Sequence, residues 1–214
     1  FILSYAHFLS KAKGDLEAAS ILYKKGIDLA PDNAFLLATY AHFLAQVGDG
    51  ESNAAASEYF QRALKISPGS GQYAMWYGKL LKKTGKIGQA ELMYKVALEQ
   101  SKGNETMEAT AMCNYATFVF KQRRDPERAN VLFKAGLGAY PEHKGLRKNY
   151  AVLVKAHPQF ASGGLAPAPA KKDRKSAADR AQLLAQNALN RLSQSKLLDT
   201  TAEGDAESDR GDDT

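Results

Sequence analysis

Small and aromatic side chains recur in the sequence at a fixed helical spacing. A small residue is followed four positions later by an aromatic residue, and three positions after that by a second small residue. Positions i, i+4 and i+7 lie on one face of an α-helix, so each copy predicts a helix that carries a ring between two small neighbours. The copies are Ala19, Tyr23 and Gly26; Ala56, Phe60 and Ala63; Ala90, Tyr94 and Ala97; Ala129, Phe133 and Gly136.

A second pattern, a tyrosine followed directly by a small residue, alternates with the first. Its copies begin at Tyr5, Tyr40, Tyr77 (followed by Gly78), Tyr115 and Tyr150, which lie 35, 37, 38 and 35 positions apart. Self-similarity at this period is typical of helical repeats, in which each hairpin must stack on its neighbours to bury its apolar face. The sequence therefore predicts an all-α protein, an α-solenoid of about four and a half helical hairpins, that acts as a binding scaffold.

Turn and cap signals place the helices. Pro31 ends one helix, and Asp32 or Asn33 is expected to cap the next; Asp125 followed by Pro126 is typical of a helix start. Extra loop residues are expected near residues 50–53. The predicted elements are a first helix at residues 1–12 and its partner at 16–30, hairpins at 34–66, 71–101 and 105–139, and a final helix at 144–155.

The composition changes after residue 157, where the repeat region is expected to end. Residues 158–175 are rich in glycine, alanine, proline and basic residues and are expected to form a flexible linker. Residues 176–198 have the pattern of an amphipathic helix, and residues 199–214 are expected to be disordered because acidic residues dominate them. Net charge follows the same division, at +7 for residues 1–160, +5 for 161–198 and −6 for 199–214.

Cysteine content and chain length limit the classes of protein. Cys113 is the single cysteine of the 214 residues, which excludes an internal disulfide and a cysteine-cluster metal site. Residues 33–48 lack Asp, Glu, Lys and Arg but are too few to cross a bilayer, which needs roughly 20 apolar residues. The chain begins at Phe1 inside a predicted helix and without methionine, so we expect it to be a fragment. The expected compartment is the cytoplasm, with the nucleus as the alternative.

The chain resembles the tetratricopeptide repeat family, whose pattern places a leucine, a glycine and a tyrosine in the first helix, and an alanine, an aromatic residue and a proline in and after the second. The copy that contains Tyr77, Gly78, Leu81 and Gly85 matches best, and the resemblance covers residues 1–157. The first helices around Tyr5 and Tyr40 are also similar to the half-a-TPR repeats of RNA-processing scaffolds. That variant requires a tryptophan and a glutamate where this chain has Leu37 and Leu44.

The resemblance implies where a partner would bind, because the first helix of each tetratricopeptide hairpin lines the concave groove. Carried over by position, the groove becomes basic toward its C-terminal end. Its candidate residues are His7, Lys11, His42, Gln46, Lys79, Lys82, Lys83, Thr117, Lys121, Lys148 and Lys155. Trp76 adjoins Tyr77 and is a further candidate.

These observations favour a non-catalytic protein-interaction scaffold whose partner is a protein or peptide segment, most simply an acidic one. The alternative is a scaffold of RNA processing with direct RNA contact, supported by the basic run at residues 171–175. No phosphate-binding loop, catalytic triad or paired carboxylates occur, and His7 and His42 lack a third metal ligand. The sequence thus predicts no enzyme activity, no cofactor, no metal, no small-molecule substrate and no membrane partner.

Overall fold

The computed structural model describes residues 2–161, which include every predicted repeat. The chain divides into two compact units, Phe1–Tyr115 and Ala116–Thr214. The predicted repeat domain, residues 1–157, spans both units. The predicted amphipathic helix and acidic tail, and all of the predicted linker beyond residue 161, lie outside the described residues.

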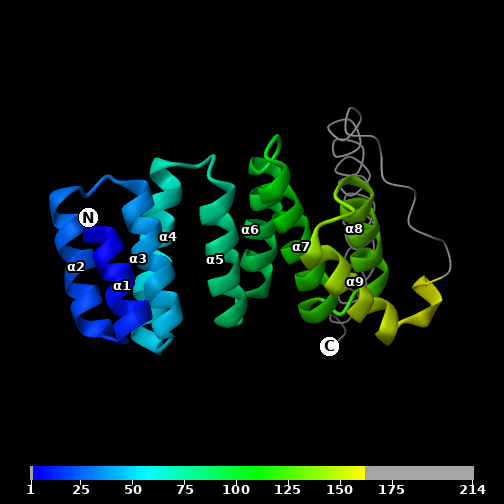
Figure 1. Cartoon of the computed structure of the whole chain (residues 1–214), viewed down its shortest axis with the longest axis horizontal. Helices are drawn as coiled ribbons and strands as arrows, with labels where there is room; N and C mark the ends of the chain where they lie inside the picture. Colours follow the sequence, from blue (N-terminus) through cyan, green and yellow to red (C-terminus); the bar gives the residue numbers. More distant parts are fainter. Residues whose placement is uncertain (1, 162–214) are drawn as a thin grey trace, which may run out of the picture. The chain divides into compact units, whose positions relative to one another are not determined.

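All regular structure between residues 2 and 161 is helical, which confirms the all-α prediction (Figure 1). The first unit contains α1 (Ile2–Phe8), η1 (Leu9–Lys13), α2 (Leu16–Leu29), α3 (Ala34–Val47), α4 (Gly50–Ile66), α5 (Gly71–Lys83), α6 (Ile87–Gln100) and the first part of α7 (Glu105–Gln122). The second unit contains the rest of α7, followed by α8 (Pro126–Ala139), α9 (Lys144–Ala156) and η2 (Pro158–Phe160).

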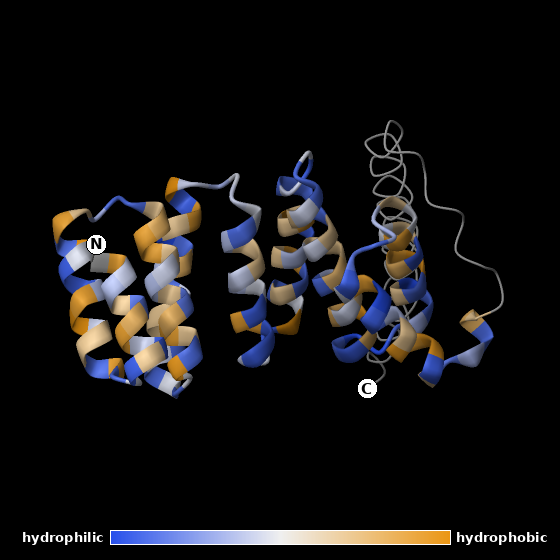
Figure 2. Cartoon of the chain, viewed as in Figure 1, coloured by the Kyte–Doolittle hydropathy of each residue, from blue (hydrophilic) through white to orange (hydrophobic). Residues whose placement is uncertain are grey.

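Consecutive helices pair as hairpins, α1 with α2, α3 with α4 and α5 with α6, and each hairpin of the first unit contacts the next. Figure 2 shows hydrophobic and hydrophilic residues in stripes along these helices, the arrangement expected of amphipathic helices that stack. The predicted hairpins at residues 34–66, 71–101 and 105–139 all have their two helices within the predicted bounds.

The N-terminal helix caps predicted from the sequence are confirmed by side-chain hydrogen bonds. The side chain of Asn33, rather than that of Asp32, accepts a 3.0 Å hydrogen bond from the backbone N–H of Leu36. Asp125 accepts one of 2.9 Å from the N–H of Arg128, and Pro126 occupies the first turn of α8. Each acceptor satisfies an N–H group that has no partner within its own helix.

The prediction of extra loop residues at 50–53 is wrong, because these residues form the first turn of α4. Gly48 ends α3 with a φ of 86°, and the Asp49 side chain accepts a 2.7 Å hydrogen bond from the N–H of Ser52. Because Gly48 ends α3 and Asp49 caps α4, the connection between the two helices is short. The additional residues instead lengthen α4 to 17 residues.

The first helix also differs from the prediction. α1 ends at Phe8, and the chain continues as a π-helical turn, η1, up to Lys13. Gly14, with a φ of 69°, ends this turn by donating its N–H to the carbonyl of Leu9. A left-handed φ of this kind favours glycine, which explains the position of this chain reversal.

Candidate functional site

The first helices of the first unit bring together a cluster of aromatic and basic side chains. The ring of Trp76 on α5 stacks on the imidazole of His42 on α3, with ring centroids 4.6 Å apart and planes 11° from parallel. Tyr73 lies one helical turn before Trp76, with its ring centroid 6.3 Å away. All three side chains are only partly buried, so a stacked aromatic surface is accessible at this position.

Lysines surround this aromatic pair. Lys11 on η1 donates a hydrogen bond to the side-chain oxygen of Gln46 on α3, and Lys83 donates one of 2.9 Å to the carbonyl of Ala45. Lys79 and Lys82 on α5 are exposed. Lys11 and Lys83 are therefore held in place by contacts with α3.

The lowered pKa values of His42 and Lys79 indicate that these basic side chains lie close together. Partial burial lowers the pKa of His42 below its ordinary value, and the positive charges of Lys79, Lys11 and His7 lower it further. The pKa of Lys79 is lowered by the same two causes, desolvation first and the charge of Lys82 second. His7, Lys11, His42 and Lys79 thus form one electrostatic cluster, although they come from four different elements, α1, η1, α3 and α5.

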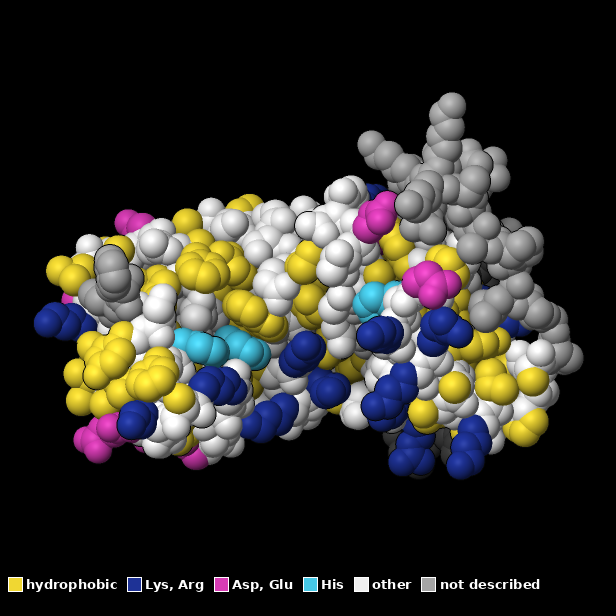
Figure 3. Space-filling model, viewed as in Figure 1, with side chains coloured by type: hydrophobic (Ala, Val, Ile, Leu, Met, Phe, Trp, Pro, Cys, Tyr) yellow, Lys and Arg dark blue, Asp and Glu magenta, His cyan; other side chains and the backbone are white. Residues whose placement is uncertain are grey.

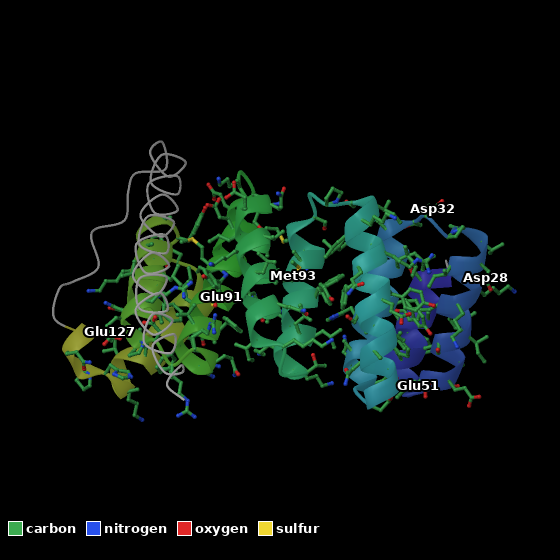
Figure 4. The ribbon with its side chains drawn as sticks, turned by 180° about the vertical axis from the view of Figure 1, so that it is seen from behind. Asp28, Asp32, Glu51, Glu91, Met93 and Glu127 are labelled. Atoms are coloured by element: carbon green, nitrogen blue, oxygen red, sulfur yellow. The ribbon has the colours of Figure 1, made fainter. Side chains whose placement is uncertain are left out.

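Acidic residues are missing from the helices that carry this cluster. Segments α1, η1, α3 and α5 contain no Asp or Glu, whereas α2, α4 and α6 contain six: Glu17, Asp28, Glu51, Glu58, Glu91 and Glu99. Figure 3 shows histidine and lysine or arginine side chains together on the face of the first unit, and Figure 4 shows Asp28, Glu51 and Glu91 on the second helices. The first-helix face, formed by α1, η1, α3 and α5, therefore has basic side chains and no carboxylate from its own helices.

The remaining groove candidates belong to the second unit. Thr117 on α7 accepts a 3.0 Å hydrogen bond from the side-chain amide of Asn149 on α9, so it joins these two helices. Lys121, Lys148 and Lys155 are exposed on α7 and α9. α9 contains four basic residues and no acidic residue, which repeats the charge pattern of α1, α3 and α5.

The repeat-signature residues lie in the interior of their units. The relative exposure of Tyr23, Phe60, Tyr94 and Phe133 is 2% or less, and Tyr150 is half-buried. The other signature positions, Ala19, Tyr40, Ala56, Tyr77, Gly78, Ala90, Ala97, Tyr115 and Ala129, are also buried.

The residue directly after the first small residue of a signature, Ser20, Ser57 or Glu91, bonds to a repeat tyrosine, which the sequence analysis did not predict. The hydroxyl of Tyr40 lies 3.1 Å from Ser20 Oγ, and that of Tyr77 lies 3.0 Å from Ser57 Oγ. Tyr115 makes the equivalent contact by donating to Glu91 Oε1 at 3.2 Å. Each tyrosine hydroxyl is thus bonded to the second helix of the preceding hairpin, and the recurrence of Ser20 and Ser57 at one repeat position was the available signal.

Residues 2–161 contain no group of three His, Cys, Asp or Glu side chains placed to hold a metal ion. None of the helices in that range combines the length and apolar composition that crossing a bilayer requires.

The lowered pKa of His42 makes stability depend on pH. Because the folded protein binds this proton less readily than the unfolded chain, stability is full above the ordinary histidine pKa of about 6.5 and falls as the pH drops toward the folded value. We expect the melting temperature to fall less between pH 7.5 and 5.5 in His42→Gln than in the unmodified protein. Burial also lowers the pKa of His143, so this residue too lowers stability as the pH drops. His143→Asn therefore measures the contribution of the second histidine separately from that of His42. An identical pH dependence with and without His42 would contradict this assignment.

Comparison with known proteins agrees with the repeat geometry. Residues 3–33 match the tetratricopeptide repeat family. The fold is similar to the crystal structure of MamA, with a TM-score of 0.56 and 14% identity over 86% of this chain and 95% of that one. It is also similar to YrrB, described as a TPR protein with an unusual peptide-binding site, with a TM-score of 0.54 and 20% identity over 88% of this chain and 90% of that one. A search of curated protein sequences finds no match.

The half-a-TPR character suggested by the first helices finds no support in these comparisons. The tetratricopeptide resemblance seen in the residues is supported: residues 3–33 match that family, and the all-helical fold is similar to that of solved structures that include a tetratricopeptide-repeat protein.

Proposed function

We propose that this chain is a non-catalytic protein-interaction scaffold, and that the first-helix face of its first unit binds an acidic segment of a partner protein. The observation that carries the proposal is the distribution of charge: the helices of this face supply lysines and histidines and no carboxylate. The peptide-binding site named for the similar fold of YrrB supports the general class of function. The cytoplasm is the proposed compartment.

The stacked pair adds a second requirement for the partner. A carboxylate brought near Lys79, whose charge acts on His42, would lie close to the accessible rings of Trp76 and His42. A partner segment that combines acidic residues with apolar or planar side chains would use both features, since charge pairs orient a ligand while ring contacts bury area. We therefore expect selected peptides to be enriched in Asp or Glu near Leu, Ile or aromatic residues.

A charge-reversal experiment tests the proposal. A displayed peptide library would be selected on the full chain, and the dissociation constant of a selected peptide measured by fluorescence anisotropy. Lys79→Glu with Lys82→Glu is expected to weaken binding by at least about tenfold, because like charges then face each other. The matched control is Lys24→Glu with Lys25→Glu, which makes the same change of net charge on exposed residues of α2.

Two results would contradict the proposal. Equal weakening by both double variants would show that only the overall charge matters. Enrichment of neutral or basic peptides would show that the partner is not acidic. A single-stranded RNA of random sequence, tested in parallel, covers the alternative function: tight, steeply salt-dependent RNA binding that both double variants weaken would favour nucleic acid.

A further inference from the structure

A pocket lies where η1 and the start of α2 meet the end of α3. Its volume is about 240 Å³. An engineered cavity of about 150 Å³ holds a benzene ring, so this space is large enough for one aliphatic side chain. It is smaller than the roughly 300–1,000 Å³ of sites that enclose a drug-sized ligand. The residues that line it are Ser10, Lys11, Leu16, Phe43, Gln46 and Val47.

Three of the lining side chains are apolar. Phe43 on α3 is 6% exposed, and its ring centroid lies 5.2 Å from that of Tyr23 on α2, so it is the fixed and buried part of the lining. Leu16 at the start of α2 and Val47 at the end of α3 are 45% and 37% exposed. A ligand that covers Leu16 and Val47 gains free energy by removing their apolar surface from water. This part of the pocket therefore favours an aliphatic group.

The polar part of the lining favours an anion. None of the six lining residues is acidic, and Lys11 supplies a positive charge. Lys11 donates to the side-chain oxygen of Gln46, but an ammonium has several N–H donors, so others are left for a ligand. Gln46 accepts this bond through its oxygen, which leaves its amide N–H groups as donors. Ser10 donates its hydroxyl hydrogen to the carbonyl of His7 at 2.9 Å, so Lys11 and Gln46 are the groups that can hold a carboxylate.

The π-helical turn η1 fixes these donors before a ligand arrives. The backbone N–H groups of Gly14 and Asp15 both donate to the carbonyl of Leu9, which closes the turn that carries Lys11. Turns of this kind occur frequently at functional sites. The bond from Lys11 to Gln46 then ties η1 to α3. Because both donors are already ordered, a ligand that uses them loses less free energy to side-chain ordering.

We propose that this pocket is a subsite for one leucine-sized aliphatic side chain of the partner segment, and that Lys11 and Gln46 bind the carboxylate of an Asp or Glu beside it. The inference rests on the proposed function, because it assigns a place to two neighbouring residues of the same acidic partner. The apolar lining selects the aliphatic side chain, and the positive charge of Lys11 selects the acidic neighbour. The pocket thus determines specificity at the η1 end of the first-helix face.

The test uses dipeptides that are blocked at both ends, so that the side chain carries the only charge. Acetyl-leucyl-aspartyl amide has both features; acetyl-leucyl-asparaginyl amide lacks the charge, and acetyl-alanyl-aspartyl amide lacks the aliphatic side chain. Each would be titrated into the full chain while NMR records the isotope-labelled methyl groups of leucine, isoleucine and valine. The leucyl-aspartyl probe is expected to shift Leu16 and Val47 saturably, and the other two probes to bind at least about tenfold more weakly. Ile21 and Leu29 on α2, which are 58% and 70% exposed, should not shift.

A pair of variants tests the role of Lys11. Lys11→Met removes the charge but keeps most of the aliphatic stem, so the affinity for the leucyl-aspartyl probe should fall to that for the leucyl-asparaginyl probe. Lys13→Met is the matched control, because Lys13 is an exposed lysine of the same turn that does not line the pocket. It should leave the affinity unchanged. Melting temperatures of both variants would show that the fold is retained.

Equal binding of the three probes would overturn the proposal, as would shifts at Ile21 and Leu29 as large as those at Leu16 and Val47. Equal weakening by the two lysine variants would also overturn it. Acetyl-leucine, whose carboxylate is terminal, is the remaining arm. Tighter binding of acetyl-leucine than of the leucyl-aspartyl probe would assign the carboxylate to a chain end and overturn the role of an acidic neighbour.

The failure of this subsite and the failure of the proposed function give different results. If the leucyl-aspartyl probe leaves Leu16 and Val47 unshifted while a selected acidic peptide still loses affinity in Lys79→Glu with Lys82→Glu, the subsite is overturned and the proposed function stands. If the probe binds at Leu16 and Val47 while the selected peptides are neutral or basic, the subsite stands and the acidic partner is contradicted.

Discussion

Replacing Tyr94 by alanine is expected to lower the free energy of unfolding by about 3–5 kcal/mol, the range for removing a large aromatic side chain from a core. Tyr94 on α6 is 2% exposed, and burial raises the pKa of its hydroxyl. Its ring lies against α5 at Gly78, where an added Cβ would be 3.5 Å from Tyr94 Cδ1. Deleting the ring would leave a cavity between the two helices of one hairpin.

The matched control is Leu92→Ala, two residues earlier on α6. Leu92 is 57% exposed, so its truncation should change stability by about 0.5 kcal/mol or less. Urea unfolding followed by circular dichroism would measure both variants. Similar losses for Tyr94 and Leu92 would mean that the helix faces are assigned incorrectly.

Replacing Gly71 by alanine is expected to cost about 1–3 kcal/mol, because the new methyl group overpacks a buried site. A Cβ at this position would lie 2.6 Å from Ser101 Oγ and 2.9 Å from the carbonyl oxygen of Ala97. These two atoms are themselves joined by a 2.6 Å hydrogen bond, and Ser101 is 3% exposed. Neither the helix carbonyl nor the bonded hydroxyl can move aside without breaking a buried contact.

Gly88→Ala provides the opposite expectation within the same hairpin. A Cβ at Gly88, in the first turn of α6, would meet no atom within 4 Å. Alanine there should stabilise the protein by about 0.4–1 kcal/mol, since it restricts the unfolded chain and favours the helix. The same unfolding measurement applies, and destabilisation by Gly88→Ala or tolerance of Gly71→Ala would contradict the described packing of α5 on α6.

The fold could be predicted because its determinants are local and repeated. The spacing of Ala90, Tyr94 and Ala97 specifies one helical face, and Asn33 and Asp125 mark helix starts through side chains that reach only three residues ahead. Such patterns depend on helix geometry alone. The one misplaced loop, residues 50–53, followed from treating additional residues as loop when Asp49 could cap a longer helix.

The candidate site could be predicted only in part, because its contacts join different repeats. The sequence places His42 and Lys79 on first helices, but it does not show that the His42 ring stacks on Trp76 or that Lys11 bonds to Gln46, 35 residues away. The hydrogen bond between Ser57 and Tyr77 was likewise hidden, since a serine on a helix surface has no pattern of its own. These contacts depend on how one hairpin stacks on another.

Trp76 is the single tryptophan of the chain, so its fluorescence reports directly on the first-helix face. The most direct test of the proposed function is to titrate the full chain with a selected acidic peptide that lacks aromatic residues, while recording both tryptophan emission and the anisotropy of the labelled peptide. The proposal predicts that the two signals saturate together, and that both are lost in Lys79→Glu with Lys82→Glu but retained in Lys24→Glu with Lys25→Glu. Saturable anisotropy with unchanged Trp76 emission would place the peptide elsewhere and contradict the account.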